Sequence, residues 1–310
     1  MKSSRSTRTI FPALLILTLS ALTLSVGAQD QPRAAWAPPA PREKAKTTFA
    51  PKPSEGDNIF KGGAERWLAD AVVEVESSGL ETIDDEFVTD YVSRLGGYLA
   101  AYSVAPTRQY QFVVLADDEP NAMSTGGGRI YVNVGMLKAV ESEDELACVI
   151  AHEIGHDAFG HAPKTVTRQL FWMTGVRKVK NYEEVKSALE NLLDAYGKNA
   201  FAVAGESLLG FSRADESEAD RAAFYNAYKA GYNPYAMKIM FKRFERQEKE
   251  GAGKNYDRDQ FLTFLFGSHP TTPQRETAIS WESNFVKMPP EEERYKSAAF
   301  DAMKARVAKL

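Results

Sequence analysis

The sequence contains few cysteine and histidine residues. Both bind metal ions, and cysteine also forms disulfide cross-links. Its 310 residues include 1 cysteine and 4 histidines. A single cysteine excludes an intramolecular disulfide and a cysteine-based zinc ribbon. A transition metal bound by this chain would therefore need histidine and carboxylate ligands, so the positions of the four histidines matter.

The chain also lacks an excess of positive charge and, after residue 28, any long apolar run. It has 38 Lys+Arg against 42 Asp+Glu, a net charge of −4 and a pI near 5.8. With no basic block, nucleic acid is not expected as a partner. A polytopic membrane protein is excluded as well. The content of 44% hydrophobic and 26% charged residues is typical of a globular protein.

Residues 1–28 have the pattern of a secretory signal peptide. Lys2, Arg5 and Arg8 precede a stretch of uncharged residues, and small residues at 26–28 suit a cleavage site. We expect cleavage, which would remove three positive charges and change the net charge from −4 to −7. The alternative is an uncleaved membrane anchor, because the uncharged stretch is just long enough to span a bilayer.

Residues 29–56 are rich in proline and contain no large aliphatic side chain. Such a segment buries too little apolar surface to offset the entropy lost on ordering, so we predict a disordered tether. A short binding motif around Trp36 is the alternative. Residues 57–310 are then expected to form one domain, with its core motifs between 120 and 275.

Hydrophobic periodicity predicts the elements of this domain. Helices are predicted over 58–77, 84–102, about 163–196, 213–230, 235–250 and 271–282 and at the C-terminus, strands over 109–115 and 129–134, and a loop over 121–128. Ser142, with Glu145 three residues later, is expected to cap another helix. The pattern indicates an α+β fold, mostly helical, with a small sheet before the capped helix.

The capped helix contains the motif His152-Glu153-x-x-His156. Residues four apart lie on one face of a helix, so both imidazoles can bind one ion. Neutral imidazole suits Zn²⁺, and an adjacent carboxylate that does not bind the metal can accept a proton from water. The motif therefore predicts one zinc ion per chain, with Glu153 as general base.

The residues alone leave the third protein ligand open. His161 follows His152 by nine positions, on nearly the opposite face of a continuous helix, so we expect it to support a ligand or end the helix. Glu216 and Asp220 lie four apart on a later predicted helix, behind Ser212 as its cap. They could supply a carboxylate ligand, but a solvated acidic first turn explains them equally well.

Four motifs occur in an order that resembles a known family of zinc peptidases. They are Pro120-Asn121-Ala122 with Gly-Gly-Arg-Ile-Tyr-Val-Asn at 127–133, Ala-His-Glu-Ile-Gly-His at 151–156, Ser-Arg-x-x-Glu-x-x-Ala-Asp at 212–220, and Ser-His-Pro at 268–270 followed by Arg275. The family includes the CaaX prenyl protease, HtpX and the soluble periplasmic BepA- and LoiP-like enzymes. The resemblance is greatest to periplasmic members without a C-terminal repeat domain, and it implies a zincin-like (gluzincin) fold.

The resemblance also implies roles that spacing cannot give. Glu216 would be the third zinc ligand, and Asp220 would hold a ligating histidine. His269 and Arg275 would lie near the metal, where they stabilise an oxyanion or, in the case of His269, keep the enzyme latent. The implied location is the periplasm.

The function expected from these features is zinc-dependent endoproteolysis of unfolded or misfolded proteins of the bacterial envelope. The alternative is a zinc-bound, largely latent chaperone or adaptor in envelope protein assembly. If the strand with Arg129, Tyr131 and Asn133 is a sheet edge beside the cleft, it would bind extended substrates by strand addition. An ordinary interior strand is the alternative, and the sequence indicates no particular oligomeric state.

Residues 163–205 separate the zinc helix from the carboxylate motif. They include the apolar run 170–173, followed by the basic residues Arg177, Lys178 and Lys180. We interpret this segment as a lid over the cleft or as a surface that contacts a membrane or a partner. The alternative is one more helix packed into the core.

Overall fold

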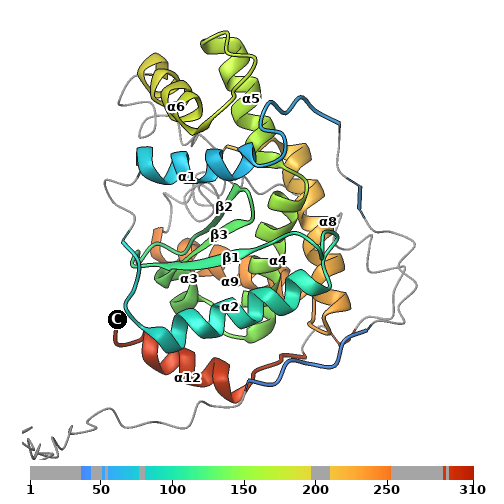
Figure 1. Cartoon of the computed structure of the whole chain (residues 1–310). Helices are drawn as coiled ribbons and strands as arrows, with labels where there is room; N and C mark the ends of the chain where they lie inside the picture. The colour runs from blue at the N-terminus through green and yellow to red at the C-terminus, as the bar shows by residue number, and fades with distance from the viewer. Residues whose placement is uncertain are drawn as a thin grey trace, which may run out of the picture. The chain divides into compact units, whose positions relative to one another are not determined.

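The structure, a computed structural model, describes residues 36–42, 51–52, 55–76, 81–196, 210–252, 289–290 and 293–310. Its elements are α1 (Ala64–Glu76), α2 (Glu86–Ala101), β1 (Gln111–Leu115), β2 (Ala122–Gly126), β3 (Arg129–Asn133), α3 (Val134–Ala139), α4 (Glu143–Ala158), α5 (His161–Met173), α6 (Tyr182–Tyr196), α8 (Arg213–Lys229), α9 (Ala236–Ala252) and α12 (Ala298–Val307). They form a mostly helical body around a small sheet, which confirms the predicted α+β class (Figure 1).

Within the described residues the sheet has three strands in the order β1-β3-β2. Strand β3 pairs in parallel with β1 and antiparallel with β2. The β2–β3 turn passes through three glycines with positive φ, Gly126, Gly127 and Gly128. A Cβ on Gly128 would lie 1.9 Å from the backbone oxygen of Gln109, so only glycine fits this crossing.

Two predictions about the sheet are wrong. Residues 122–126, which were expected in a loop, form strand β2, because the backbone pairs with β3 despite a weak β-former sequence. Strand β3 is the central strand rather than an edge. Arg129, Tyr131 and Asn133 therefore belong to a strand whose two sides are already bonded, so it cannot accept an added substrate strand.

Helix α4 runs through the centre of the fold and is buried from residue 143 to residue 157. One side of it contacts the sheet and another contacts α8. Ala219, Ala222 and Ala223 of α8 are at most 3% exposed. A Cβ on Gly155 of α4 would lie 2.8 Å from the Cβ of Ala222, so the two helices approach as closely as glycine and alanine allow.

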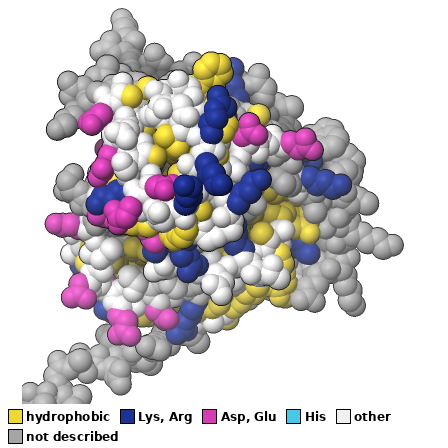
Figure 2. All heavy atoms as spheres, turned by 45° about the horizontal axis from the view of Figure 1, so that its top comes forward, with side chains coloured by type: hydrophobic (Ala, Val, Ile, Leu, Met, Phe, Trp, Pro, Cys, Tyr) yellow, Lys and Arg dark blue, Asp and Glu magenta, His cyan; other side chains and the backbone are white. Residues whose placement is uncertain are grey.

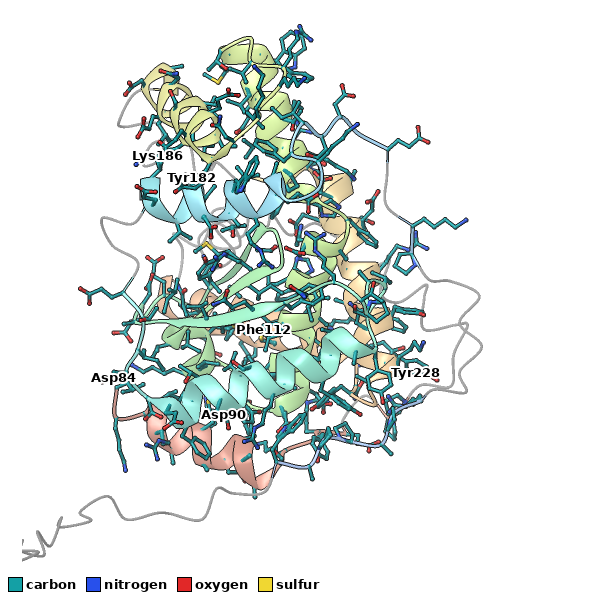
Figure 3. All side chains as sticks on the ribbon, viewed as in Figure 1. Asp84, Asp90, Phe112, Tyr182, Lys186 and Tyr228 are labelled. Carbon is teal, nitrogen blue, oxygen red and sulfur yellow. The ribbon has the colours of Figure 1, made fainter. Side chains whose placement is uncertain are left out.

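Helices α1, α5 and α6 share a hydrophobic cluster of their own, on the far side of the sheet from α2 and α12 (Figure 1). Figure 3 shows Tyr182 and Lys186 of α6 at the end of α1, where both bind the carboxylate of Glu74. The predicted helix over 163–196 is two helices. It is interrupted after α5, where Gly175 adopts a positive φ of 72°.

Residues 36–42 are packed against the body, which corrects the prediction of disorder for this part of 29–56. The indole of Trp36 meets the ring of Tyr98 edge-on at 5.6 Å and donates to Glu143 of α4. The guanidinium of Arg42 donates to the carbonyls of Tyr228 and Tyr232 and lies over the Tyr228 ring (Figure 3). Aromatic and arginine contacts, rather than aliphatic burial, hold this segment.

Several predicted features lie outside the described residues. They are the signal peptide at 1–28, the helix at 271–282, and the sites His269 and Arg275. In the part of the chain that the structure describes, no helix has the length and apolarity needed to cross a bilayer.

Candidate metal centre

Two capped helices present the predicted ligands to each other. Helix α4 begins after Ser142, whose hydroxyl accepts a hydrogen bond from the Glu145 backbone N–H at 3.2 Å. The Glu145 carboxylate bonds to the N–H of Glu141 rather than to that of Ser142, so the predicted capping box is only half formed. Helix α8 has the full box, between Ser212 and Asp215. These caps fix where each helix starts and so which face it turns inward.

His152 and His156 of α4 converge with Glu216 of α8. The two Nε2 atoms are 2.9 Å apart. The Glu216 carboxylate lies 3.5 Å from Nε2 of His152 and 3.4 Å from Nε2 of His156. All three residues are at most 2% exposed. The structure thus brings together the three predicted ligands, including the carboxylate that spacing alone left open.

This arrangement fits a divalent transition metal ion. Ligand atoms bound at about 2.0–2.1 Å to a tetrahedral ion lie roughly 3.3 Å apart, close to the three separations found here. Two imidazoles and one carboxylate form the donor set that zinc uses in hydrolases, where a fourth position stays open. The described part of the chain contains one such cluster of histidine and acid side chains.

The Nδ1 atoms of His152 and His156 each contact a different partner. Nδ1 of His152 lies 3.1 Å from the carboxylate of Asp220, as the resemblance implied. Nδ1 of His156 lies 2.8 Å from Nδ1 of His161, and Nε2 of His161 lies 3.3 Å from the Glu218 carboxylate. When Nε2 of His156 faces a metal, its Nδ1–H must donate to His161, which in turn donates to Glu218.

The pKa shifts agree with these roles. Burial lowers the pKa of His161 below its ordinary value even though Asp215 and Glu218 act to raise it, so the ring is neutral and can accept from His156. Burial also acts to lower the pKa of His152. Its bonds to Asp220 and Glu216 outweigh that effect and raise the pKa to about 9. A metal ion that binds the imidazole of His152 therefore competes with a proton.

His161 confirms the expectation of a supporting residue behind a ligand. It begins α5 after Gly160, whose positive φ of 64° turns the chain back toward α4. The sequence did not reveal Glu218 as its partner, nor Phe211, whose ring stacks on His156 at 4.1 Å. No pattern could have identified them, because both contacts join segments distant in sequence.

Glu153 is buried on α4 beside His152, with 2% of its surface exposed. The helix therefore carries the predicted general base next to the two imidazoles. A carboxylate that directly follows one of these histidines in a helix is displaced by about 100° around the axis, so Glu153 does not share the face of His152 and His156.

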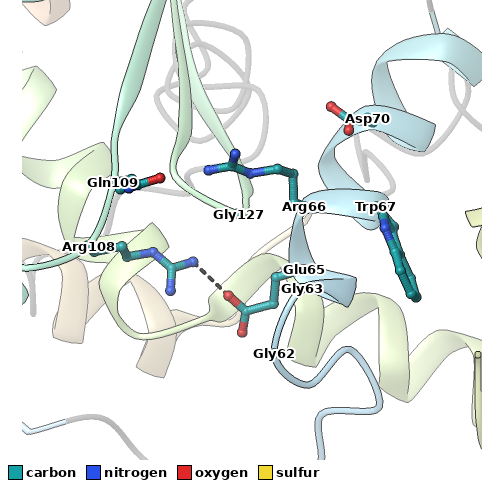
Figure 4. Close-up of a pocket in the computed structure, with 9 residues that line it drawn as sticks. All are labelled: Gly62, Gly63, Glu65, Arg66, Trp67, Asp70, Arg108, Gln109 and Gly127. Atoms are coloured by element: carbon teal, nitrogen blue, oxygen red, sulfur yellow. Dashed lines mark hydrogen bonds and ion pairs between the residues drawn. The ribbon is translucent and has the colours of Figure 1, made fainter. Parts of the chain in front are cut away.

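A salt-bridge network that the sequence did not reveal stabilises the end of α4. Asp157 accepts hydrogen bonds from the Gly128 N–H at 2.8 Å and from Arg108. Arg108 also binds Glu65 of α1 at 2.7 Å (Figure 4). Burial raises the pKa of Asp157 although Arg108 opposes this. A pocket of about 590 Å³ opens beside Arg108 and Glu65, and none of the three ligands lines it.

Sequence comparisons identify relatives of this chain. The "Beta-barrel assembly-enhancing protease" of Yersinia pestis is 24% identical over 191 residues, which cover 60% of this chain and 38% of that protein. The protein of the same name from Escherichia coli is 23% identical over 192 residues, with 60% and 39% covered. The "Mitochondrial metalloendopeptidase OMA1" of Schizosaccharomyces pombe is 29% identical over 189 residues, with 60% and 50% covered.

The chain thus matches half or less of the length of these relatives. Residues 87–282, more than half of the chain, match the sequence profile of "Peptidase family M48". The matched range contains the converging ligands His152, His156 and Glu216. The chain belongs to peptidase family M48.

Proposed function

We propose that this protein is a zinc-dependent metalloendopeptidase that hydrolyses peptide bonds in unfolded or misfolded proteins of the bacterial cell envelope. The observation that carries the proposal is the convergence of His152, His156 and Glu216, with Glu153 beside them on α4. The relatives named as proteases and as a metalloendopeptidase support the reaction type.

The chain's own residues would bind the ion and move one proton. A zinc ion at His152, His156 and Glu216 would supply Lewis acidity toward water and toward the scissile carbonyl. Glu153 accepts the proton of the attacking water and passes it to the leaving amine. Asp220 and His161 keep the imidazoles in the tautomer that binds metal. His269 and Arg275 are proposed to stabilise the oxyanion.

An extended polypeptide is the proposed substrate. Strand β2 is an edge of the described sheet and packs on α4, the helix that carries the two histidines. A substrate segment could add to this edge and so place its backbone beside the metal centre. Unfolded and misfolded proteins expose such segments along their chains. The predicted signal peptide at 1–28 and the bacterial relatives support a periplasmic location.

A largely latent chaperone or adaptor that binds zinc is the second candidate. The burial of the centre favours it, because the three ligands and Glu153 are all at most 2% exposed. A scissile carbonyl must reach the metal, so this enclosed arrangement has to open before cleavage. Opening on substrate binding would reconcile the centre with peptidase activity, whereas a permanently closed centre would not.

Casein digestion with a parallel zinc determination tests the proposal. Residues 29–310 are compared with Glu153→Gln, and Glu190→Gln on the exposed face of α6 serves as a matched control. We expect internal cuts by the wild type and the control, none by Glu153→Gln, and about one zinc in each. Zinc without cleavage in all three would support the latent chaperone. A folded wild type without zinc would contradict the metal site.

A further inference from the structure

The end of α5 exposes a large apolar surface to solvent. Figure 1 shows α5 and α6 projecting beyond α1, away from the sheet. At this tip Trp172 is 85% exposed and Met173 is 36% exposed. Among the described residues, the one other large hydrophobic residue with comparable exposure is Leu310 at the C-terminus. The tip therefore carries two of the three large hydrophobic residues that are exposed in the described structure.

This exposure does not come from a poorly packed helix. Leu170 and Val166 of the same helix are completely buried in the cluster with α1 and α6. The predicted alternative of core packing is thus confirmed for Leu170 and wrong for Trp172, because the two side chains point to opposite sides of α5. A well-anchored helix holds Trp172 outward.

The segment that contains Trp172 carries charge of one sign. Arg168, Arg177, Lys178 and Lys180 are exposed, and residues 168–180 contain no acid. The chain as a whole has a net charge of −4, so this segment is basic in an otherwise acidic protein. The nearest acids along the chain are in the first turn of α6, where Glu184 accepts from the backbone N–H of Lys180 at 2.9 Å.

The mixture of charged and apolar side chains on this surface also limits what it can bind. The guanidinium of Arg177 lies 5.0 Å from the centre of the Phe171 ring, so charge and apolar surface are interleaved. Figure 2, with the top of Figure 1 turned forward, shows Lys and Arg side chains gathered next to hydrophobic ones on this face. A protein partner usually requires a broad apolar patch, whereas a bilayer interface accepts a single tryptophan with cations nearby.

We propose that the tip formed by Trp172, Met173 and these four cations docks on an anionic phospholipid membrane. Trp172 and Met173 would enter the boundary between headgroups and acyl chains, and the cations would contact lipid phosphates. None of the metal ligands belongs to this surface, so the proposal is independent of the peptidase activity. Docking there would hold the body of the protein beside the membrane.

Vesicle flotation tests this proposal. Residues 29–310 are mixed with vesicles of phosphatidylethanolamine and phosphatidylglycerol, or of phosphatidylcholine alone. We expect binding to the anionic vesicles, weakening as salt is added. Trp172→Ser and the double variant Lys178→Gln, Lys180→Gln should each lower the binding constant by roughly tenfold. Leu310→Ser and Lys309→Gln, at the C-terminus, are matched controls that should bind as the wild type does.

Three outcomes would overturn the proposal. They are equal binding to both vesicle types, binding that Trp172→Ser leaves unchanged, and the absence of flotation by the wild type. If Trp172→Ser instead weakens binding of unfolded casein without affecting flotation, the tip is a protein-binding surface. Far-ultraviolet circular dichroism of each variant separates these results from a failure to fold.

Discussion

At the scale of single residues, the candidate metal centre depends on side chains outside the cluster of His152, His156 and Glu216. His161 is completely buried and lies between His156 and Glu218. When Nε2 of His156 faces a metal, His161 accepts from His156 and donates to Glu218, which fixes the orientation of His156. Loss of a partner of this kind typically lowers metal affinity by roughly 10–100-fold.

Substitution of His161 separates this orienting role from simple packing. His161→Leu fills the space but cannot accept from His156, so we expect zinc affinity to fall by about tenfold or more. His161→Asn places an oxygen near the position of Nδ1 and should restore much of that affinity. Competition with a chromogenic chelator measures it. Equal zinc affinity in the two variants would show that only the volume of the side chain matters.

At the scale of elements, the contact between α4 and α8 joins the two halves of the centre. His152 and His156 are on one helix and Glu216 is on the other. Their separation is set where Gly155 faces Ala222. Any group larger than hydrogen at this point must push the helices apart, which would also move Glu216 away from the histidines.

Two glycine substitutions compare this contact with an open position. Gly155→Ala would place its Cβ 2.8 Å from Ala222, and we expect a loss of about 1–3 kcal/mol in the free energy of unfolding, with weaker zinc binding. Gly97→Ala in α2 meets nothing within 4 Å and should stabilise by about 0.5–1 kcal/mol. Urea titration measures both changes. A stabilising Gly155→Ala would contradict the close approach of the helices.

The first turn of α4 is acidic and buried, which is unusual for a helix start. Glu143, Asp144 and Glu145 are each at most 1% exposed. Nη1 and Nη2 of Arg243 donate to the two carboxylate oxygens of Glu145, at 2.6 and 2.8 Å. Asp144 accepts from the backbone N–H groups of Asn233 and Tyr295. Burial outweighs these bonds and raises the pKa of Asp144 to about 6.

This raised pKa predicts a pH effect on stability. The unfolded carboxyl has a pKa of about 3.9, so between pH 4 and 6 the folded chain holds a proton that the unfolded chain has lost. The contribution of Asp144 to stability is therefore present below pH 4 and is lost as pH rises through about 6. Relative to Asp144→Asn, the wild type should lose about 1 kcal/mol between pH 5 and 7.5.

The comparison needs a control substitution at an exposed carboxylate. Asp90→Asn, at an exposed ion pair with Arg94 on α2, is the matched control. Its difference from the wild type should be the same at pH 5 and pH 7.5. Urea unfolding at both pH values gives the free energies. A difference for Asp144→Asn that stays constant with pH would contradict the assigned burial.

At the scale of the whole molecule, segments from both ends of the described chain meet at the start of α4. Glu143 accepts from the indole of Trp36 at 3.1 Å, from the hydroxyl of Tyr232 at 2.7 Å and from Ser297, the cap of α12. One buried carboxylate thus connects the N-terminal segment, the α8–α9 turn and the last helix. The helix with the two histidines is anchored through its first residue.

Truncation tests the role of residues 36–42. A chain that begins at Ala34 retains these contacts and should unfold at the same temperature as one that begins at Gln29. A chain that begins at Glu43 loses Trp36 and Arg42, and we expect a loss of about 1–3 kcal/mol. Differential scanning fluorimetry compares the three. Equal melting temperatures would restore the tether interpretation for the whole of 29–56.

The sequence by itself determined the parts of the centre that depend on local geometry. The spacing of His152 and His156 fixes one helix face, and Ser142 and Ser212 fix two helix starts, because these features depend on neighbours within four residues. The order of the motifs then implied Glu216 and Asp220. Patterns of this kind are visible in a chain before it folds.

Only the tertiary structure decided how distant segments meet. Periodicity could not show that β3 is the central strand, because strand order depends on pairing between segments far apart. It could not tell buried Leu170 from exposed Trp172, two residues away on the same helix. The partner of His161 and the docking of Trp36 are likewise long-range contacts. Each depends on which surfaces remain available after the core has formed, and no local pattern records that.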